Sequence, residues 1–257
     1  NLPREQHISM LKAVKARAVC VSEEFRDRKG FVPVHIIGPD KCQADMKLFK
    51  GANVPDKYTA SLLFTSGTTG TPKIVMLTHR NFIRTAIAID EFETHYNEIQ
   101  LAILPLFHVY AFTATFLAPL FSRSTIVFQT SLKGPDIMRS LQEYPVTVFP
   151  AAPIMWELFF DAITNKLKSE SMAKYRLFMF MANNAPVLKV MGLGFVVRKV
   201  FAPVHDVFGH RHKFFISGGA PMKREYFRWF KNMGFNIMEG YGLTETTGPI
   251  AIPFYSR

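Results

Sequence analysis

Cysteine is scarce in this chain. Its 257 residues include only Cys20 and Cys42, with no CxxC pair and no ladder of cysteine and histidine. Two cysteines do not make the disulfide framework of a small secreted domain, and a structural zinc site needs more ligands of this kind. The sequence therefore favours a reducing compartment, and we expect a cytoplasmic protein.

Long apolar runs are also lacking. No run reaches the roughly 18 to 20 residues that a membrane-spanning helix needs. The first residues, NLPREQHISMLKAVKARAVC, lack the apolar stretch of a signal peptide. We expect nothing in this sequence to span a bilayer.

The composition indicates a folded chain with a basic surface. Apolar residues make up 48% and charged residues 20%, which is unlike a disordered chain and allows a substantial core. The 31 basic and 20 acidic residues give a formal net charge of +11. This excess favours a polyanionic partner, whether nucleotide phosphates, an anionic membrane or nucleic acid.

Short apolar runs alternate with helical patterns along the chain. The predicted strands are RAVCVS, VHIIG, ASLLFTS, KIVMLT, QLAILP, STIVFQ, VTVFP, KFFISGG and NIMEGYG. Helical spacing of apolar residues occurs in NFIRTAIAIDEFETHY, DIMRSLQEY, IMWELFFDAITNKL and KREYFRWFKNMG. The alternation predicts an α/β fold with twisted sheets flanked by helices. We find no repeat, no low-complexity segment and no linker that separates two domains.

The nonapeptide TSGTTGTPK, residues 65 to 73, lies between two predicted strands and should form the connection of a hairpin. Its glycines allow main-chain N–H groups to converge on an anion, and its hydroxyls and lysine complete a phosphate cradle. The alternative is a polar turn with a solvated lysine. It is not a Walker A loop, because Pro72 precedes Lys73 and Ile74 follows it.

The nonapeptide resembles the phosphate loop of the adenylate-forming superfamily, which includes acyl-CoA synthetases, firefly luciferase and the adenylation domains of peptide synthetases. Three further stretches, LPLFHVYAF, FFISGGAPM and MEGYGLTETTGPI, resemble motifs of this superfamily in the family order. The residues NFI after THR are similar to the start of the helix that follows the phosphate loop. The resemblance extends over nearly the whole chain and implies the large N-terminal AMP-binding domain.

The resemblance implies roles for individual residues, with ATP, Mg²⁺ and CoA as the small molecules bound. Lys73, Thr244 and Glu245 would have the catalytic roles, and Glu245 would be the Mg²⁺ ligand, since a carboxylate is a hard oxygen donor. Read without the resemblance, GYGLTET is a strand-to-loop turn and SGGAP an ordinary turn after a strand. The implied nucleotide-binding set is Thr65, Ser66, Gly67, Thr68, Thr69, Gly70, Thr71, Lys73, Gly219, Ala220, Pro221, Glu239, Gly240, Tyr241, Gly242 and Thr244.

His108 stands at the head of a predicted helix that begins in VYAFTATFLAPL. A single histidine is more often structural or solvated. In acyl-CoA-forming members of the superfamily, an aromatic residue or histidine at this position borders the acyl and CoA sites. The resemblance therefore implies that His108 and Val109 contact substrate, without an acid–base role.

The same stretch bears on the substrate. An enzyme that activates an amino acid needs a carboxylate to hold the substrate ammonium, yet no Asp, Glu, Lys or Arg lies between Leu101 and Leu120. An apolar acid is therefore favoured. SGGAPM and EGYGLTETTGPI resemble long-chain fatty acyl-CoA synthetases more closely than aryl-acid ligases.

Residues 166–213 interleave Lys and Arg with apolar residues. The first interpretation is core helices with a solvated basic face, and the second is a membrane-surface patch. Nucleic-acid contact ranks last, because no recognition motif is present, and we expect no nucleic-acid partner. A metal cluster of His205, His210 and His212 is disfavoured, because no acid or thiolate stands at ligand spacing.

The resemblance implies a long-chain fatty acid–CoA ligase, which joins a fatty acid to CoA through an acyl adenylate. The rivals are a fatty acyl-AMP ligase, another acid-activating relative and a non-catalytic nucleotide- or acyl-binding remnant. The ribose-binding aspartate motif, the hinge and the C-terminal lid with its lysine do not appear, so we expect residues 1–257 to be a fragment of the AMP-binding domain.

Lys73→Ala and Thr68→Ala should each weaken MgATP binding, because each removes one phosphate contact from an otherwise intact loop. A hydrogen bond to a charged group contributes about 1.5 to 3 kcal/mol. Calorimetric titration with MgATP measures the loss. Wild-type affinity in both variants would contradict the phosphate-loop interpretation.

Overall fold

The structure, a computed structural model, describes residues 4–15, 18–20, 35–37, 53–65, 73–93 and 98–252. It divides the chain into two compact units, residues 1–55 and 56–257. The described elements of the first unit are helix α1 (Arg4–Ala13) and strands β1 (Ala18–Cys20) and β2 (His35–Ile37). The two strands pair in parallel and fall within the predicted stretches RAVCVS and VHIIG.

The second unit begins with a β-hairpin. Strands β3 (Thr59–Thr65) and β4 (Lys73–Thr78) run antiparallel, with Thr65 opposite Lys73 at the end of the ladder. The pairing confirms the hairpin predicted around TSGTTGTPK. Residues 66–72, which join the two strands, lie outside the described residues.

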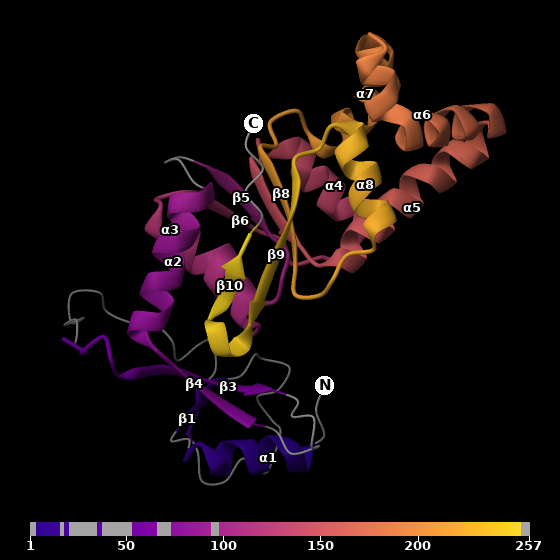
Figure 1. The fold of residues 1–257 in the computed structure, drawn as a ribbon. Coiled ribbons are helices and arrows are strands. Elements are labelled where there is room, and N and C mark those ends of the chain that lie inside the picture. The colour runs from indigo at the N-terminus through magenta and orange to yellow at the C-terminus, as the bar shows by residue number, and fades with distance from the viewer. Residues whose placement is uncertain are drawn as a thin grey trace. The chain divides into compact units, whose positions relative to one another are not determined.

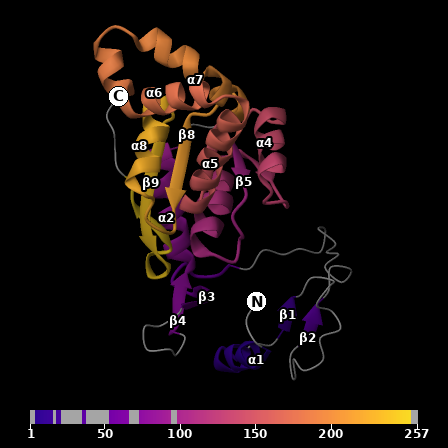
Figure 2. The same cartoon turned by 90° about the vertical axis from the view of Figure 1, so that its right-hand side faces the viewer.

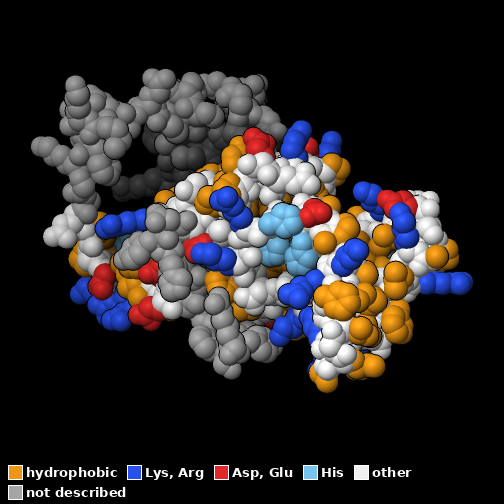
Figure 3. Space-filling view, turned by 90° about the horizontal axis from the view of Figure 1, so that it is seen from above, with side chains coloured by type: hydrophobic (Ala, Val, Ile, Leu, Met, Phe, Trp, Pro, Cys, Tyr) orange, Lys and Arg blue, Asp and Glu red, His pale blue; other side chains and the backbone are white. Residues whose placement is uncertain are grey.

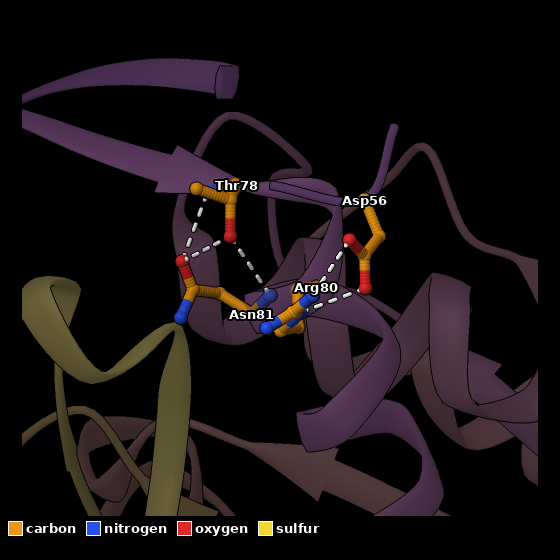
Figure 4. A network of polar contacts seen from close by, with 4 residues as sticks. All are labelled: Asp56, Thr78, Arg80 and Asn81. Atoms are coloured by element: carbon orange, nitrogen blue, oxygen red, sulfur yellow. Dashed lines mark hydrogen bonds and ion pairs between the residues drawn. The ribbon is translucent and has the colours of Figure 1, made fainter. Parts of the chain in front are cut away.

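Side chains on both sides of the β4–α2 junction fix the start of helix α2 (His79–Glu93) (Figure 4). The side-chain Oδ1 of Asn81 accepts from Thr78 N at 2.9 Å and from Thr78 Oγ1 at 2.7 Å, in the manner of a capping box. Arg80 donates through Nε and Nη2 to the two carboxylate oxygens of Asp56, at 2.7 and 2.9 Å. This hydrogen bond holds the pKa of Asp56 below its usual range. The predicted helix is confirmed, but it begins at His79, two residues before the predicted start at Asn81.

A six-stranded sheet forms the centre of the second unit, in the order β10-β9-β8-β7-β5-β6. Its strands are β5 (Ile99–Ala102), β6 (Thr125–Phe128), β7 (Val148–Ala151), β8 (Phe214–Gly218), β9 (Ile237–Leu243) and β10 (Gly248–Ala251). All neighbours pair in parallel except β9 and β10. The sequence predicted the first five of these strands and missed β10.

Both faces of this sheet carry apolar side chains. Phe149 and Phe215 point into the main core, where Trp156 is fully buried, whereas their neighbours Val148 and Ile216 belong to a separate cluster on the opposite face. Successive residues of a strand point to opposite faces, so such strands need helices on both sides. Helices α4 (Gly134–Glu143), α5 (Pro153–Glu170) and α8 (Arg224–Met233) lie on one side, with α2 and α3 (Ala118–Phe121) on the other (Figure 1).

Helices α6 (Met172–Val190) and α7 (Gly194–Phe208) lie at one end of the second unit in both views (Figures 1 and 2). Their buried residues join the main core, with Phe178 and Ala182 on α6 and Phe201 and Phe208 on α7. The first interpretation of residues 166–213, core helices, is confirmed for these faces. None of the helices in the described ranges has the length and apolar composition needed to cross a bilayer.

The three histidines near the end of α7 each have a protein partner. His205 Nε2 lies 2.9 Å from Met233 O, His212 Nδ1 contacts Gly209 O, and His210 Nε2 lies 2.7 Å from an Asp206 oxygen. The His205 ring stacks against both His212 and Phe235, which also contact each other. In the part of the chain that the structure describes, no group of three His, Cys, Asp or Glu side chains is placed to hold a metal.

His212 should make the stability of the fold depend on pH. Burial lowers the pKa of its ring, and positive charge on His205 and His210 lowers it further. The unfolded chain therefore takes up this proton near the ordinary pKa of about 6.5, before the folded chain does. The stability contributed by the neutral ring is complete above that pH and is lost as pH falls below it and through the lower pKa of the folded chain.

We expect the free energy of unfolding of His212→Gln, measured in urea, to change less between about pH 7 and pH 5 than that of wild type. His79→Gln, which alters an exposed histidine of α2, is the control and should keep the wild-type slope. Equal slopes in wild type and His212→Gln would show that His212 is not the responsible group.

Candidate active site

Three of the motifs singled out in the sequence follow strands of the parallel sheet. LPLFHV follows β5, the GGAP segment follows β8, and GYGLTET forms the end of β9 and the turn after it. The carboxyl ends of parallel strands lie at one edge of a sheet, where ligand crevices form in open α/β folds. The topology thus brings together motifs that are more than a hundred residues apart.

A pocket of about 350 Å³ opens at this edge. Ten predicted site residues line it, namely Thr65, Lys73, His108, Val109, Gly219, Gly240, Tyr241, Gly242, Thr244 and Glu245. The ends of the β3–β4 hairpin supply Thr65 and Lys73, which lie against the sheet edge although they come from another sheet. The structure therefore gathers predicted residues of all four motifs around one cavity.

The remaining predicted residues fall into two groups. Residues 66–71, that is Ser66, Gly67, Thr68, Thr69, Gly70 and Thr71, lie outside the described residues, and their roles stay predictions. Ala220, Pro221 and Glu239 are not among the pocket-lining residues. An oxygen of Glu239 instead accepts the backbone N–H of Met222 at 3.1 Å, which ties β9 to the turn after β8.

The sequence reasoning missed four lining residues, Tyr110, Leu243, Gly248 and Pro249. Gly248 and Pro249 belong to β10, a strand too short and too rich in glycine and proline to be recognised from its pattern. Tyr110 lies two residues from His108, and its role depends on what faces it in space. Leu243 could have been predicted from the sequence, because it precedes the predicted site residue Thr244.

A single-turn 3₁₀ helix, Thr244–Thr246, presents the two proposed phosphate and metal ligands. Thr246 Oγ1 accepts the Leu243 N–H at 2.8 Å and lies 2.8 Å from Gly248 O, so one hydroxyl bridges both ends of the turn. Thr247 follows in the left-handed region, with φ of 66°. These contacts leave Thr244 and Glu245 at the pocket lining.

Two glycines permit the close approaches that shape this edge. A Cβ on Gly242 would stand 2.0 Å from Gly248 O, so a side chain there would prevent β9 and β10 from closing. A Cβ on Gly218 would stand 2.9 Å from the Tyr110 ring. The Tyr110 ring therefore occupies the space that the side chain of any residue other than glycine at position 218 would need.

His108 is exposed and precedes the helix, as predicted. Its Nδ1 accepts the backbone N–H of Tyr110 at 3.2 Å, which satisfies one of the free donors at the start of the helix. The ring thus has a capping contact as well as a place at the pocket.

The helix beyond His108 is unusual. Residues Ala111–Leu117 form a π-helix, a geometry that is rare and frequently found at functional sites. Gln100 of β5 donates to Ala114 O at 2.9 Å. An apolar row runs along this segment, because the rings of Phe82, Phe112, Phe116 and Phe128 follow one another at 5.6 to 6.3 Å.

The pocket lining combines groups suited to a nucleotide with a divalent cation. Lys73 brings a positive charge to the lining, and the Tyr241 side chain there is 60% exposed. A cation suits phosphates and an exposed aromatic ring suits a purine. Glu245 adds one carboxylate and Thr244 a hydroxyl. This arrangement, on an α/β fold of this topology, is that expected of a nucleotide-binding class of protein.

Comparison with known families matches residues 3–257 to the family described as AMP-binding enzyme. The chain belongs to that family, as the resemblance predicted. It is 30% identical over 196 residues to the peroxisomal long chain acyl-CoA synthetase 7 of Arabidopsis thaliana, covering 73% of this chain and 27% of that protein. It is 32% identical over 211 residues to the human long-chain-fatty-acid–CoA ligase ACSBG2, covering 75% of this chain and 31% of the relative.

Among solved structures, the chain is similar to an O-succinylbenzoate coenzyme A synthetase from Bacillus subtilis in complex with ATP and magnesium ion. The TM-score is 0.71 at 20% identity, covering 98% of this chain and 45% of the solved one. At this identity the likeness confirms the fold alone. The chain thus spans under a third of each curated relative named above and under half of this solved chain.

Gly218→Ala should damage the pocket by displacing the Tyr110 ring. Forcing a methyl group into a packed site typically costs about 1 to 3 kcal/mol of stability, and we expect MgATP binding to weaken as well. Gly134→Ala is the matched control, because a Cβ there meets nothing within 4 Å. Urea unfolding and MgATP titration of both variants test this, and indistinguishable variants would contradict the role of Gly218.

Proposed function

We propose that this chain is the nucleotide- and acid-binding part of an AMP-forming acid–CoA ligase that acts on a long-chain fatty acid. The observation that carries the proposal is the single pocket in which Lys73, Thr244, Glu245 and Tyr241 lie beside His108, at the head of an apolar helix. In this proposal residues 1–257 belong to the large AMP-binding domain of such an enzyme. Family membership and the long-chain relatives support it.

The pocket residues fit Mg²⁺ bound together with a triphosphate. Mg²⁺ is usually held by one or two carboxylates, with phosphate oxygens and water completing its octahedron. Glu245 supplies one carboxylate at the lining, on a turn fixed by Thr246. When bound, the ion would offset negative charge on the phosphates.

The residues of the chain would act by position and charge. Tyr241 would stack on the adenine, and Lys73 and Thr244 would contact phosphate oxygens, so that the α-phosphate faces the substrate carboxylate. That carboxylate attacks the α-phosphate, pyrophosphate leaves, and the CoA sulfur then displaces AMP from the acyl adenylate. Donors fixed before reaction stabilise the charge that develops, and no protein nucleophile is required.

The apolar row along the π-helix supports an apolar acid. Phe112 and Phe116 lie in the π-helix that follows His108, Phe128 continues the row, and no charged side chain lies in this helix. A substrate ammonium would have no counter-charge along the π-helix. The resemblance of SGGAPM and EGYGLTETTGPI to long-chain enzymes favours a fatty acid over an aryl acid.

Binding of acyl-adenylate mimics, in which a sulfamoyl group replaces the phosphate, tests the acid class. We expect the palmitoyl mimic to bind at least about tenfold more tightly than the benzoyl mimic, since each buried CH₂ group contributes about 0.8 kcal/mol. Calorimetry with this chain gives both constants. Tyr241→Ala should weaken both mimics alike, because it would remove the purine stack and not an acyl contact.

Tighter binding of the benzoyl mimic would show that the substrate is an aryl acid and not a fatty acid. If neither mimic binds, the assignment of the pocket as a nucleotide site is refuted. Pyrophosphate release with palmitate, measured with and without CoA together with thioester formation, separates a CoA ligase from a fatty acyl-AMP ligase.

A further inference from the structure

The turn between α6 and α7 exposes a group of large apolar side chains. We define the α6–α7 tip as residues 187–195. Val190 and Met191 are 89% and 67% exposed, and Val187, Leu193 and Phe195 are exposed as well. Soluble surfaces seldom gather this many large apolar side chains in nine residues, and such a patch indicates an interaction site.

The tip is a fixed structure and not a frayed end. Leu193 N donates to Leu188 O at 2.8 Å and Gly192 N to Lys189 O at 3.1 Å, with Gly192 at a φ of 81°. This pair of bonds is the Schellman motif that closes a helix. The apolar side chains are therefore held outward by a rigid turn.

Basic side chains outnumber acidic ones on the two helices that meet at this tip. Residues 172–208 contain five Lys or Arg and a single carboxylate, Asp206. That carboxylate is paired with His210. Hydrophobic side chains lie close to Lys, Arg and His side chains on the face seen from above in Figure 3.

A second pocket, of about 580 Å³, lies beside the tip. Its lining includes Lys189 and Gly194 of the tip itself, together with Arg198, His205 and His210. All lining residues are described, and four are basic while none is acidic. Lys189 Nζ and His205 also reach main-chain oxygens near the end of α8, at 3.5 and 2.9 Å. Those bonds position the two side chains but leave the charge of Lys189 without a carboxylate partner among the described residues.

We infer that the α6–α7 tip binds the surface of a bilayer that contains anionic phospholipid. The tip side chains enter the boundary between headgroups and acyl chains, and the pocket of Lys189 and Arg198 receives a lipid phosphate. This binding goes beyond the proposed ligase activity and does not depend on it.

The mixture of side chains favours a lipid surface over a protein partner. Protein interfaces are depleted of Lys at their centre, whereas Lys and Arg beside apolar residues are typical of helices that lie in the headgroup region. Lysine and arginine can keep their charge at phosphate depth while their stems cover apolar surface. The tip and the pocket share Lys189, so one lipid could contact both.

Vesicle binding by the full chain tests the inference, with vesicles of phosphatidylcholine alone and of equal parts phosphatidylcholine and phosphatidylserine. We expect binding to the anionic vesicles only. Val190→Asp should weaken it about tenfold, because an apolar contact becomes a like charge, and Arg198→Gln about fivefold. Leu120→Asp and Arg84→Gln are the matched controls, since they make the same kinds of change on exposed residues of α3 and α2.

Urea unfolding establishes that the four variants remain folded. Equal binding to both vesicle types, or wild-type binding by Val190→Asp, would overturn the inference. Self-association that Val190→Asp abolishes, detected by light scattering without vesicles, would assign the tip to a second copy of the chain instead. Binding of inorganic phosphate by the pocket without any vesicle binding would leave a free anion as its ligand and would also overturn the inference.

Discussion

The rest of the second unit depends on a parallel sheet that is apolar on both faces. Phe149 and Phe215 face one side while Val148 and Ile216 face the other, so helices must cover both. Because helices cover both faces, polar groups can reach solvent only at the edges of the sheet and at the ends of its strands. The carboxyl ends of β5, β8 and β9 therefore become the natural position for a ligand, and the motifs follow those ends.

Close backbone approach then shapes the pocket. Gly242 allows β10 to turn back against β9, and Gly218 allows Tyr110 to lie over the end of β8. Both approaches depend on the absence of a Cβ. These two glycines are therefore required by close packing and are not flexible spacers.

Charge is used differently at the two ends of this unit. At the sheet edge, Lys73 and Glu245 bring opposite charges to one pocket that suits a metal–phosphate complex. At the α6–α7 tip, basic side chains stand beside exposed apolar ones. In the proposed ligase, the tip would hold the protein at the bilayer in which its apolar acid substrate dissolves, and the pocket would activate that acid.

The sequence by itself determined the α/β class, the β3–β4 hairpin and nine strand positions, because alternating apolar residues and turn residues are local signals. It also identified Lys73, Tyr241 and Glu245 through motifs that are contiguous in the chain. Only the tertiary structure decided that these motifs share one pocket, that β10 completes the sheet and that Tyr110 fills the space above Gly218. Those facts depend on which residues meet across long separations, and that is settled by packing the sheet between its helices and not by any local pattern.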